Sequence, residues 1–302
     1  MIAVVGESLI DVINGQGIIG GCPLNVARAT SRLGASVAYY GKISQDSYGL
    51  DILQTLINDC VFFDPALCND SLKTLCSEAK LDENGKASYV FNYENTCTSN
   101  LKKEELVSAF DIANDIDIVF YGSIALLMEP GCDAIVPAID SIKTKPIRFL
   151  DPNVRPFMIK DAQAFKEMIL KYASQSEIVK ASEEDIAFLY PGISILEAEK
   201  QLLDTCKMHL IITRAQNGST WYSKSFRLDA KALETNVVDT VGCGDVFSAA
   251  VMTYIEKHNL ARSLDNIDKD TVAKILDYAS RAAALNCNKK GCNPPYENEL
   301  GL

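Results

Sequence analysis

The chain has 302 residues, of which 48% are hydrophobic and 23% are charged. This composition can bury a sizeable core, which excludes an intrinsically disordered chain, and the length suits one large α/β domain. The formal net charge of -11 argues against non-specific binding to nucleic acid or to an anionic membrane, because such binding requires basic patches. We therefore expect a small-molecule partner, no nucleic acid and no membrane.

The number and spacing of the cysteines and histidines limit which metal sites and catalytic groups the chain can form. The ten cysteines lack the spacing of metal ligands, and the two histidines are His209 and His258. A histidine-based metal site or a Ser-His-Asp triad is therefore poorly supported. No secretory leader is recognisable, and no apolar run reaches the roughly 20 residues that a membrane span needs. We expect a cytoplasmic protein with free, mostly buried thiols.

Strand and helix patterns alternate along most of the chain. Apolar runs predict strands at residues 2–5, 36–40, 117–121, 147–150, 178–180 and 210–213. Helical spacing predicts helices at residues 23–33, 47–60, 132–142, 162–173, 183–189 and 193–206. This alternation predicts a parallel sheet covered by helices on both faces.

The segment from about residue 67 to residue 100 has a different pattern. Residues 72–79 and 87–93 mix polar and apolar side chains, and a turn sequence at residues 82–85 separates them. Two such runs around a turn predict a hairpin, and a hairpin inside an α/β chain suggests a small appended sheet. We find no repeat and no linker, so we expect one domain over residues 1–302.

A glycine-rich turn precedes a helical pattern near the C-terminal end. The stretch Asp239-Thr-Val-Gly-Cys-Gly-Asp245 follows a strand-like Asn236-Val-Val and leads into a helix from Asp245 to Lys257. Backbone N–H groups at such a turn can hold phosphoryl oxygens at a helix N-terminus. A carboxylate beside them can accept the proton of an attacking hydroxyl. Asp245 could instead merely cap the helix.

A second polar group lies near the start of the chain. Gly6-Glu-Ser-Leu-Ile-Asp11 is followed by Gly20-Gly21-Cys-Pro23-Leu-Asn25. An Asp and an Asn offer acceptors and a donor to a polyol, and paired glycines let the backbone approach it closely. Asp11 could also close a turn, and Asn25 could simply belong to the first turn of a helix begun at Pro23.

Together the two stretches resemble the signatures of the ribokinase-like (PfkB) sugar kinases. The C-terminal signature of that family usually has alanine where this chain has Cys243. Only the backbone N–H is needed there, so cysteine should be tolerated. The resemblance implies that Asp245 is the catalytic base and that Gly242, Cys243 and Gly244 form an anion hole. It also implies that sugar hydroxyls are contacted by Asp11, Gly21 and Asn25.

Gly41–Gly49 resembles a segment of the family that borders the sugar pocket. Two further segments are similar to the fructokinase branch: Tyr121-Gly-Ser-Ile-Ala-Leu with Glu129-Pro130, and Asp151-Pro-Asn-Val-Arg155. The last ends a predicted strand, at the sheet edge where α/β proteins bind ligands. Arg155 could meet a phosphate there or form a surface ion pair. The implied fold is a three-layer α/β/α ribokinase-like domain with a mostly parallel central sheet and a small β lid, from about residues 10–20 and 68–100.

The nucleotide side matches the family less regularly. Lys180-Ala-Ser182-Glu-Glu-Asp185 resembles a segment that has Asn and Glu where this chain has Ser182 and Asp185. A magnesium role of Asp185 through water and a plain helix cap by Ser182 therefore both stay open. The resemblance implies that ATP is bound by Lys180, Thr213, Gly218 and Ser280, with Ala215 replacing a family glycine. Asp239 and the loop near Gly291 match a family site for a monovalent cation such as K⁺.

The expected reaction is transfer of the ATP γ-phosphoryl group to a sugar hydroxyl with Mg²⁺, and fructose is the first expectation for the sugar. Residues 89–94, Tyr-Val-Phe-Asn-Tyr-Glu, lack an arginine that fructokinases often carry, so ribose, 2-keto-3-deoxygluconate, tagatose-type sugars and nucleosides stay open. A non-catalytic sugar-binding relative is another alternative. An NAD-dependent oxidoreductase would have to use the weak Gly15-Gln-Gly-Ile-Ile-Gly20 motif. Small exposed sheets attract partners, so a homodimer through the lid is also expected.

Overall fold

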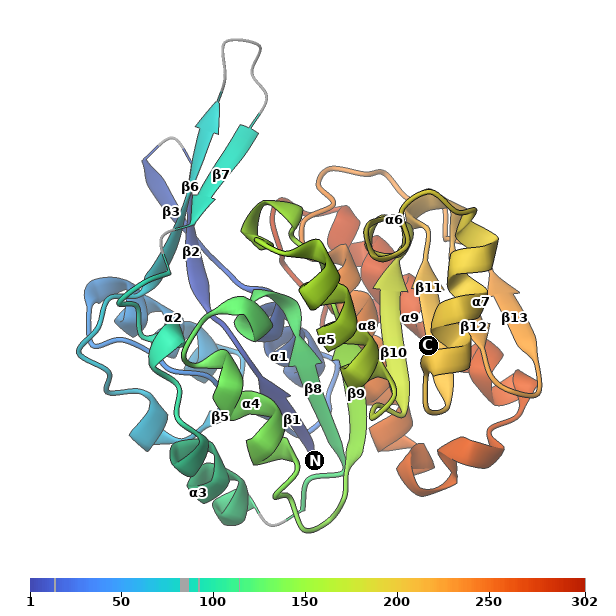
Figure 1. The fold of residues 1–302 in the computed structure, drawn as a ribbon, viewed down its shortest axis with the longest axis horizontal. Helices are drawn as coiled ribbons and strands as arrows, with labels where there is room; N and C mark the ends of the chain where they lie inside the picture. The colour runs from blue at the N-terminus through green and yellow to red at the C-terminus, as the bar shows by residue number, and fades with distance from the viewer. Residues whose placement is uncertain (14, 82–86, 92, 114, 302) are drawn as a thin grey trace.

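The computed structural model describes residues 1–13, 15–81, 87–91, 93–113 and 115–301, and its centre is a nine-stranded sheet (Figure 1). The strand order is β13-β12-β11-β10-β9-β8-β1-β4-β5. All neighbours pair in parallel except β11 with β12 and β12 with β13. The strands are β1 (Ile2–Val5), β4 (Val37–Tyr40), β5 (Phe62–Phe63), β8 (Ile118–Gly122), β9 (Ile147–Asp151), β10 (Ile178–Ser182), β11 (His209–Thr213), β12 (Ser219–Tyr222) and β13 (Arg227–Ala230).

Helices cover both faces of this sheet. One apolar core packs under α1 (Cys22–Arg32), α2 (Ser47–Asn58), α8 (Cys243–Lys257) and α9 (Lys269–Cys287). The other packs under α3 (Lys103–Ala113), α4 (Cys132–Ile139), α5 (Ala162–Ala173), α6 (Glu183–Leu189) and α7 (Ile195–Thr205). Ile2 and Val4 of β1 belong to the first core, whereas Ala3 and Val5 belong to the second, as the two-residue period of a strand requires. The three-layer α/β/α prediction is confirmed.

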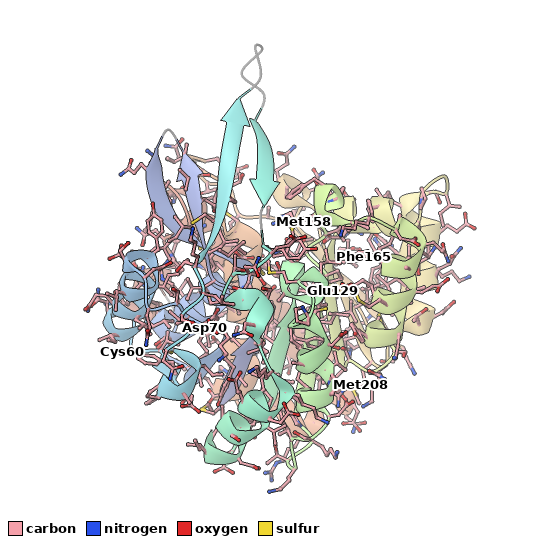
Figure 2. The ribbon with its side chains drawn as sticks, turned by 60° about the vertical axis from the view of Figure 1, so that its left-hand side comes forward. Cys60, Asp70, Glu129, Met158, Phe165 and Met208 are labelled. Atoms are coloured by element: carbon pink, nitrogen blue, oxygen red, sulfur yellow. A yellow bond between two sulfur atoms is a disulfide. The ribbon has the colours of Figure 1, made fainter. Side chains whose placement is uncertain are left out.

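A second, four-stranded sheet stands off the main body (Figure 1). Its order is β3 (Gln16–Gly20), β2 (Leu9–Ile13), β6 (Leu75–Leu81) and β7 (Ala87–Phe91). The two outer pairs are antiparallel and β2 pairs with β6 in parallel. Leu9 and Leu75 pack with Ile124 and Met128 at the base of this lid, and Met158 lies against the same cluster (Figure 2).

The described part of the chain also contains short 3-10 helices. They are η1 (Pro65–Leu67), η2 (Thr98–Asn100), η3 (Ser123–Leu127), η4 (Pro156–Met158), η5 (Ala215–Asn217), η6 (Leu260–Asn266) and η7 (Glu297–Leu300).

Three local expectations turn out differently. Asn236-Val-Val is not a strand: Val237 and Val238 are exposed, and the Val238 N–H donates to the Cys287 carbonyl of α9 at 2.8 Å. The glycines from Gly15 to Gly20 lie in the β2–β3 hairpin, not between a strand and a helix, so they do not form a dinucleotide site. The turn expected at residues 82–85, and the side chains of residues 89–92, lie outside the described part of the chain.

Candidate active site

The first turn of α8 presents backbone N–H groups beside Asp245. Gly242 caps the helix with φ +74°, a conformation that favours glycine, and a β-carbon there would overlap the Cys292 side chain. The amides of Gly244 and Asp245 belong to the first turn, where no earlier helical carbonyl can accept from them. The Cys243 amide, by contrast, donates to the Thr240 carbonyl at 3.2 Å. The helix therefore directs a partly positive end toward the half-buried Asp245.

Asn25 joins the two signature motifs. Its Nδ2 donates to Asp245 Oδ2 at 2.9 Å, across 220 residues of sequence. Asn25 is 5% exposed, and within the described residues its Oδ1 has no hydrogen-bond partner. Gly21, whose carbonyl accepts from the Asn25 N–H at 2.9 Å, has φ +107°, and a β-carbon on it would lie 2.8 Å from the Glu7 carbonyl oxygen. The fold thus brings Gly21 and Asn25 to the same place as Asp245.

Asp11 and Arg155 form a second group at the lid. The Ser77 hydroxyl of β6 donates to Asp11 Oδ1 on β2. Burial raises the pKa of Asp11, while the Ser77 hydrogen bond and the nearby Arg155 cation partly offset that effect. Arg155 is exposed, and its guanidinium donates to the Asn153 and Val154 carbonyls at 3.3 Å and 3.1 Å. The Arg155 cation is close enough to stabilise the charged form of the Asp11 carboxylate.

Lys180 makes a buried ion pair below the glycine turn. Its Nζ lies 2.9 Å from Asp151 Oδ2, which also accepts from the Ser248 hydroxyl at 3.1 Å. Burial disfavours the cation, but attraction to Asp151 and Asp185 outweighs burial and raises the pKa of Lys180. A β-carbon placed on Gly244 would lie 3.3 Å from Lys180 Nζ. The ammonium group is thus next to the predicted anion hole.

Asp185 takes part in the start of α6. Its Oδ2 accepts from the Ser182 N–H at 2.8 Å, and the Ser182 hydroxyl accepts from the Asp185 N–H, which completes a capping box. Its Oδ1 accepts from the Val154 N–H at 2.7 Å. The cap is therefore confirmed, and a magnesium role through water stays a prediction.

Asp239 connects the glycine turn to the closing loop. Its Oδ1 accepts from the Val241 N–H at 3.0 Å and its Oδ2 from the Gly291 N–H at 2.8 Å. These two backbone hydrogen bonds are the main cause of its lowered pKa. The expected proximity of Asp239 and the loop near Gly291 is present, and the cation role stays a prediction.

The remaining nucleotide-side residues lie at strand and helix positions further along the sheet. Thr213 ends β11, Gly218 has φ +92°, and Ser280 is half-exposed on α9. In the part of the chain that the structure describes, no hydrogen bond or ion pair connects these three with Asp245. Ala215, which replaces a family glycine, has φ +46° and so keeps a backbone conformation that glycine would adopt more easily.

Comparison with known proteins decides the family. The sequence profile of the pfkB family carbohydrate kinases matches residues 2–299. The chain belongs to the pfkB family of carbohydrate kinases. The resemblance inferred from the motifs is confirmed, as is the expected class of activity, an ATP-dependent sugar kinase.

The relatives of this pfkB kinase include several fructokinases. It is 30% identical over 293 residues to the probable chloroplastic fructokinase-6 of Arabidopsis thaliana, covering 96% of this chain and 74% of that protein. It is 30% identical over 282 residues to fructokinase-2 of Oryza sativa subsp. japonica, covering 91% and 81%. The structure of Xylella fastidiosa fructokinase with bound ATP has the same fold, with a TM-score of 0.88, 22% identity and coverage of 99% and 97%.

Two site residues of this pfkB kinase were not expected from its sequence. Burial raises the pKa of Glu7 to about 7, although its carboxylate accepts from the Ser123 hydroxyl at 2.8 Å and the Ala125 N–H at 3.1 Å. Burial also raises the pKa of Cys22, whose thiol hydrogen-bonds to Asp245. The available signal was a charged residue two positions after the buried strand β1, which marks Glu7 as unusual.

The expectation that all cysteines are free is wrong for one pair. Cys243 and Cys287 are joined in a disulfide, with 6.2 Å between their Cα atoms. The expectation of mostly buried thiols is also wrong: Cys22, Cys97 and Cys206 are buried, but Cys60 is exposed and Cys68, Cys132 and Cys292 are half-exposed. The pfkB signature position 243 is therefore covalently tied to the end of α9.

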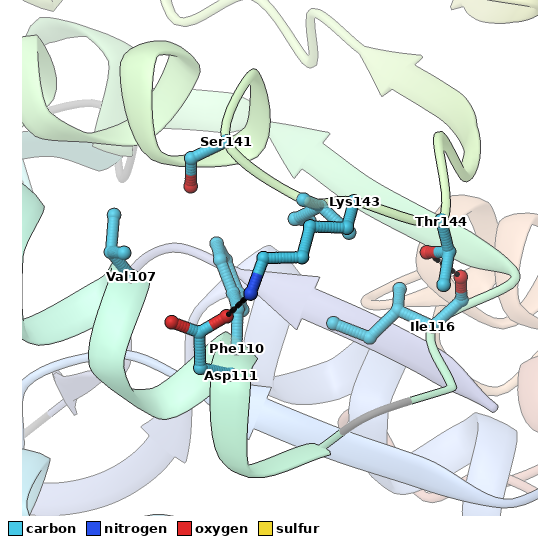
Figure 3. Close-up of a pocket in the computed structure, with 8 residues that line it drawn as sticks. Val107, Phe110, Asp111, Ile116, Ser141, Lys143 and Thr144 are labelled. Atoms are coloured by element: carbon cyan, nitrogen blue, oxygen red, sulfur yellow. Dashed lines mark hydrogen bonds and ion pairs between the residues drawn. The ribbon is translucent and has the colours of Figure 1, made fainter.

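A separate pocket of about 350 Å³ lies between α3 and the loop before β9 (Figure 3). It is lined by Phe110 and Ile116, with a Lys143–Asp111 ion pair of 3.2 Å at its mouth. None of its lining residues belongs to the groups around Asp245 or Asp11, so we do not assign it to the kinase site. Among the described helices, none is long and apolar enough to cross a membrane.

Proposed function

We propose that this kinase transfers the γ-phosphoryl group of ATP to a hydroxyl of fructose, with Asp245 as the base. The observation that carries the proposal is the 2.9 Å hydrogen bond from Asn25 Nδ2 to Asp245 Oδ2. It puts the sugar motif and the phosphoryl motif of the family in direct contact. A carboxylate at this point would accept the proton of a sugar hydroxyl.

The start of α8 supports the phosphoryl side of the reaction. The amides of Gly242 and Gly244 and the positive end of the helix would stabilise negative charge on the transferring group. The Cys243 amide would join them once it leaves the Thr240 carbonyl. The Lys180 ammonium beside Gly244 would add positive charge there, partly neutralised by its ion pair with Asp151. Such fixed donors contribute most when they are already oriented before the substrate binds.

The sugar side is supported by unsatisfied and exposed polar groups. Asn25 Oδ1 is a buried acceptor without a partner within the described residues, and buried polar atoms usually have one. A sugar hydroxyl donating to it would satisfy this atom. Asp11 and Gly21 would contact further hydroxyls, and Arg155 would meet a phosphate. Fructose is proposed because the relatives with about 30% identity are named fructokinases.

The residues present fit a magnesium ion that is held mainly by ATP. Mg²⁺ usually keeps several waters and binds one or two carboxylates together with substrate phosphates. No cluster of three or more metal-binding side chains occurs among the described residues, which suits such a site better than a protein cage. Asp151, whose buried Oδ1 has no partner in that part of the chain, and Asp185 through water are the residues that would hold the ion. When bound, Mg²⁺ would neutralise charge on the phosphate oxygens.

ATP itself would lie between Lys180 and the ends of β11 and α9. We propose contacts with Thr213, Gly218 and Ser280, on the strength of the family resemblance. Potassium would bind beside Asp239, whose carboxylate retains acceptor capacity beyond its two backbone hydrogen bonds. Replacing K⁺ by a large organic cation should then lower turnover, and unchanged turnover would remove the cation site from the proposal.

We also propose a single-domain, cytoplasmic protein that forms a homodimer through the lid. Ile13 and Ile18 of the lid are 40% and 39% exposed, and a second copy would cover them. Sedimentation velocity should show a dimer for the wild type and a monomer for Ile18→Asp. A wild-type monomer at micromolar concentration would contradict this part.

The substrate is tested with purified protein, ATP, Mg²⁺ and a panel of acceptors, with ADP release as the readout. Fructose should give the highest kcat/KM, above ribose, 2-keto-3-deoxygluconate, tagatose and a nucleoside. A higher value for another acceptor would replace fructose in the proposal. No acceptor-dependent ADP release at all would refute the proposed reaction.

A further inference from the structure

Cys243 and Cys287 meet at the point where the anion-hole turn touches the end of α9. Cys243 is the first residue of α8 and Cys287 the last residue of α9, 44 positions apart. Their Cα separation of 6.2 Å is within the usual disulfide span. Both residues are half-exposed, so a small reagent can reach them.

The surrounding backbone holds this pair in place independently of the sulfur–sulfur bond. The Cys287 carbonyl accepts from the N–H groups of Val238 and Asp239, at 2.8 Å and 3.2 Å. Asn286 Nδ2 donates to the Val241 carbonyl at 2.9 Å. The two cysteines therefore stay close when reduced, and the bond can form and break without refolding.

We propose that Cys243 and Cys287 are a reversible modification site that takes a low-molecular-weight disulfide such as oxidised glutathione, and that the oxidised kinase is the less active form. The effect on turnover rests on the proposed function. In reducing compartments, disulfides that do form are usually transient or redox-sensing.

The chemistry is a thiol–disulfide exchange in two steps. The N-terminus of α8 favours the thiolate of Cys243, which attacks one sulfur of the reagent and releases the first thiolate. Cys287, as thiolate, then attacks Cys243 Sγ in the mixed disulfide and releases the second thiolate. The two released thiolates take up the two protons that the cysteines lose. The protein pair is oxidised and the reagent is reduced by the same two electrons.

The disulfide form explains why activity should fall. In this form the Cys243 amide donates to Thr240 at 3.2 Å, so it is directed to the chain and not toward a phosphoryl group. The bond to Cys287 ties residue 243 to α9 and keeps it there. In the reduced form residue 243 is held by hydrogen bonds and no longer by a covalent link, so the turn can adjust to a bound phosphoryl group and the Cys243 amide can leave Thr240. Loss of one such donor costs about 10²–10³ in kcat in other enzymes, so we expect a fall of at least about tenfold.

The test compares the kinase after dithiothreitol with the kinase after oxidised glutathione. Alkylation and peptide mapping should locate a Cys243–Cys287 link, and kcat should fall at least about tenfold and recover with dithiothreitol. Cys287→Ser should have wild-type kcat when reduced and should resist the reagent. Cys60→Ser removes an exposed thiol beyond α2 and should behave as wild type (Figure 2). If Cys287→Ser does not fold, Cys287→Ala replaces it in the same test.

Three results would overturn the proposal. The first is a disulfide from Cys243 to Cys292, a cysteine that lies against Gly242. The second is an unchanged kcat in protein that is fully linked. The third is inactivation of Cys287→Ser by oxidised glutathione to the same extent as the wild type. If the reduced wild type phosphorylates no acceptor, the proposed function fails while the mapped link still tests the modification site.

Discussion

Replacing Glu7 by Gln removes a carboxyl group that is 1% exposed and has no cation partner among the described residues. Burial raises the pKa of Glu7 from 4.5 to about 7. Between these pH values the folded chain keeps a proton that the unfolded chain has lost, so the stability of the wild type falls as pH rises through this window. A pKa raised from 4.5 to about 7, at about 1.4 kcal/mol for each pH unit, corresponds to about 3 kcal/mol.

The assay is urea unfolding of wild type and Glu7→Gln at pH 5 and pH 8. Gln keeps an acceptor for the Ala125 N–H, so the variant should fold. The free energy of unfolding of the wild type should fall by about 3 kcal/mol more than that of the variant. Glu104→Gln removes an exposed carboxylate of α3 and should leave the wild-type difference unchanged. Equal pH dependence in wild type and Glu7→Gln would refute the reasoning.

Three further substitutions test other parts of the structure. Lys180→Met leaves Asp151 buried without its cation and should cost about 3–5 kcal/mol in urea unfolding, and a loss below about 1 kcal/mol would mean that the pair is solvated. Ala215→Gly relieves a positive φ and should raise the free energy of unfolding by about 1 kcal/mol, whereas a decrease would contradict the strained conformation. Gly242→Ala pushes a β-carbon into Cys292 and should lower kcat at least about tenfold, and a wild-type kcat would separate this turn from the reaction.

Local sequence patterns predicted helices and strands well where the spacing of apolar side chains marks the buried face. The predicted bounds of α5 and α6 agree with the structure, because an apolar stripe and a capping residue mark each of them. The strands β12 and β13 were not predicted. The short β13, with the sequence Arg-Leu-Asp-Ala, lies at the sheet edge and carries too little apolar pattern to be recognised. Asn236-Val-Val looked like a strand, but its backbone bonds to α9 instead.

The site could not be predicted in full, because it is formed by contacts between residues that are far apart in the sequence. The motifs around Asn25 and Asp245 were recognisable separately, whereas their hydrogen bond joins residues 220 positions apart. The carboxylate of Glu7 accepts from Ser123 and Ala125, more than one hundred positions away. The Cys243–Cys287 bond likewise follows only from how α8 and α9 pack. Spacing alone cannot predict such pairs, because the topology decides which strand and helix ends meet.

Steady-state turnover of Asp245→Asn with ATP and fructose tests the central claim most directly. Asn can still accept the hydrogen bond from Asn25 but cannot take a proton from a hydroxyl, so the fold and ATP binding should persist. We predict a loss of about 10²–10⁴ in kcat with an unchanged unfolding midpoint. Turnover close to that of the wild type would show that Asp245 is not the base.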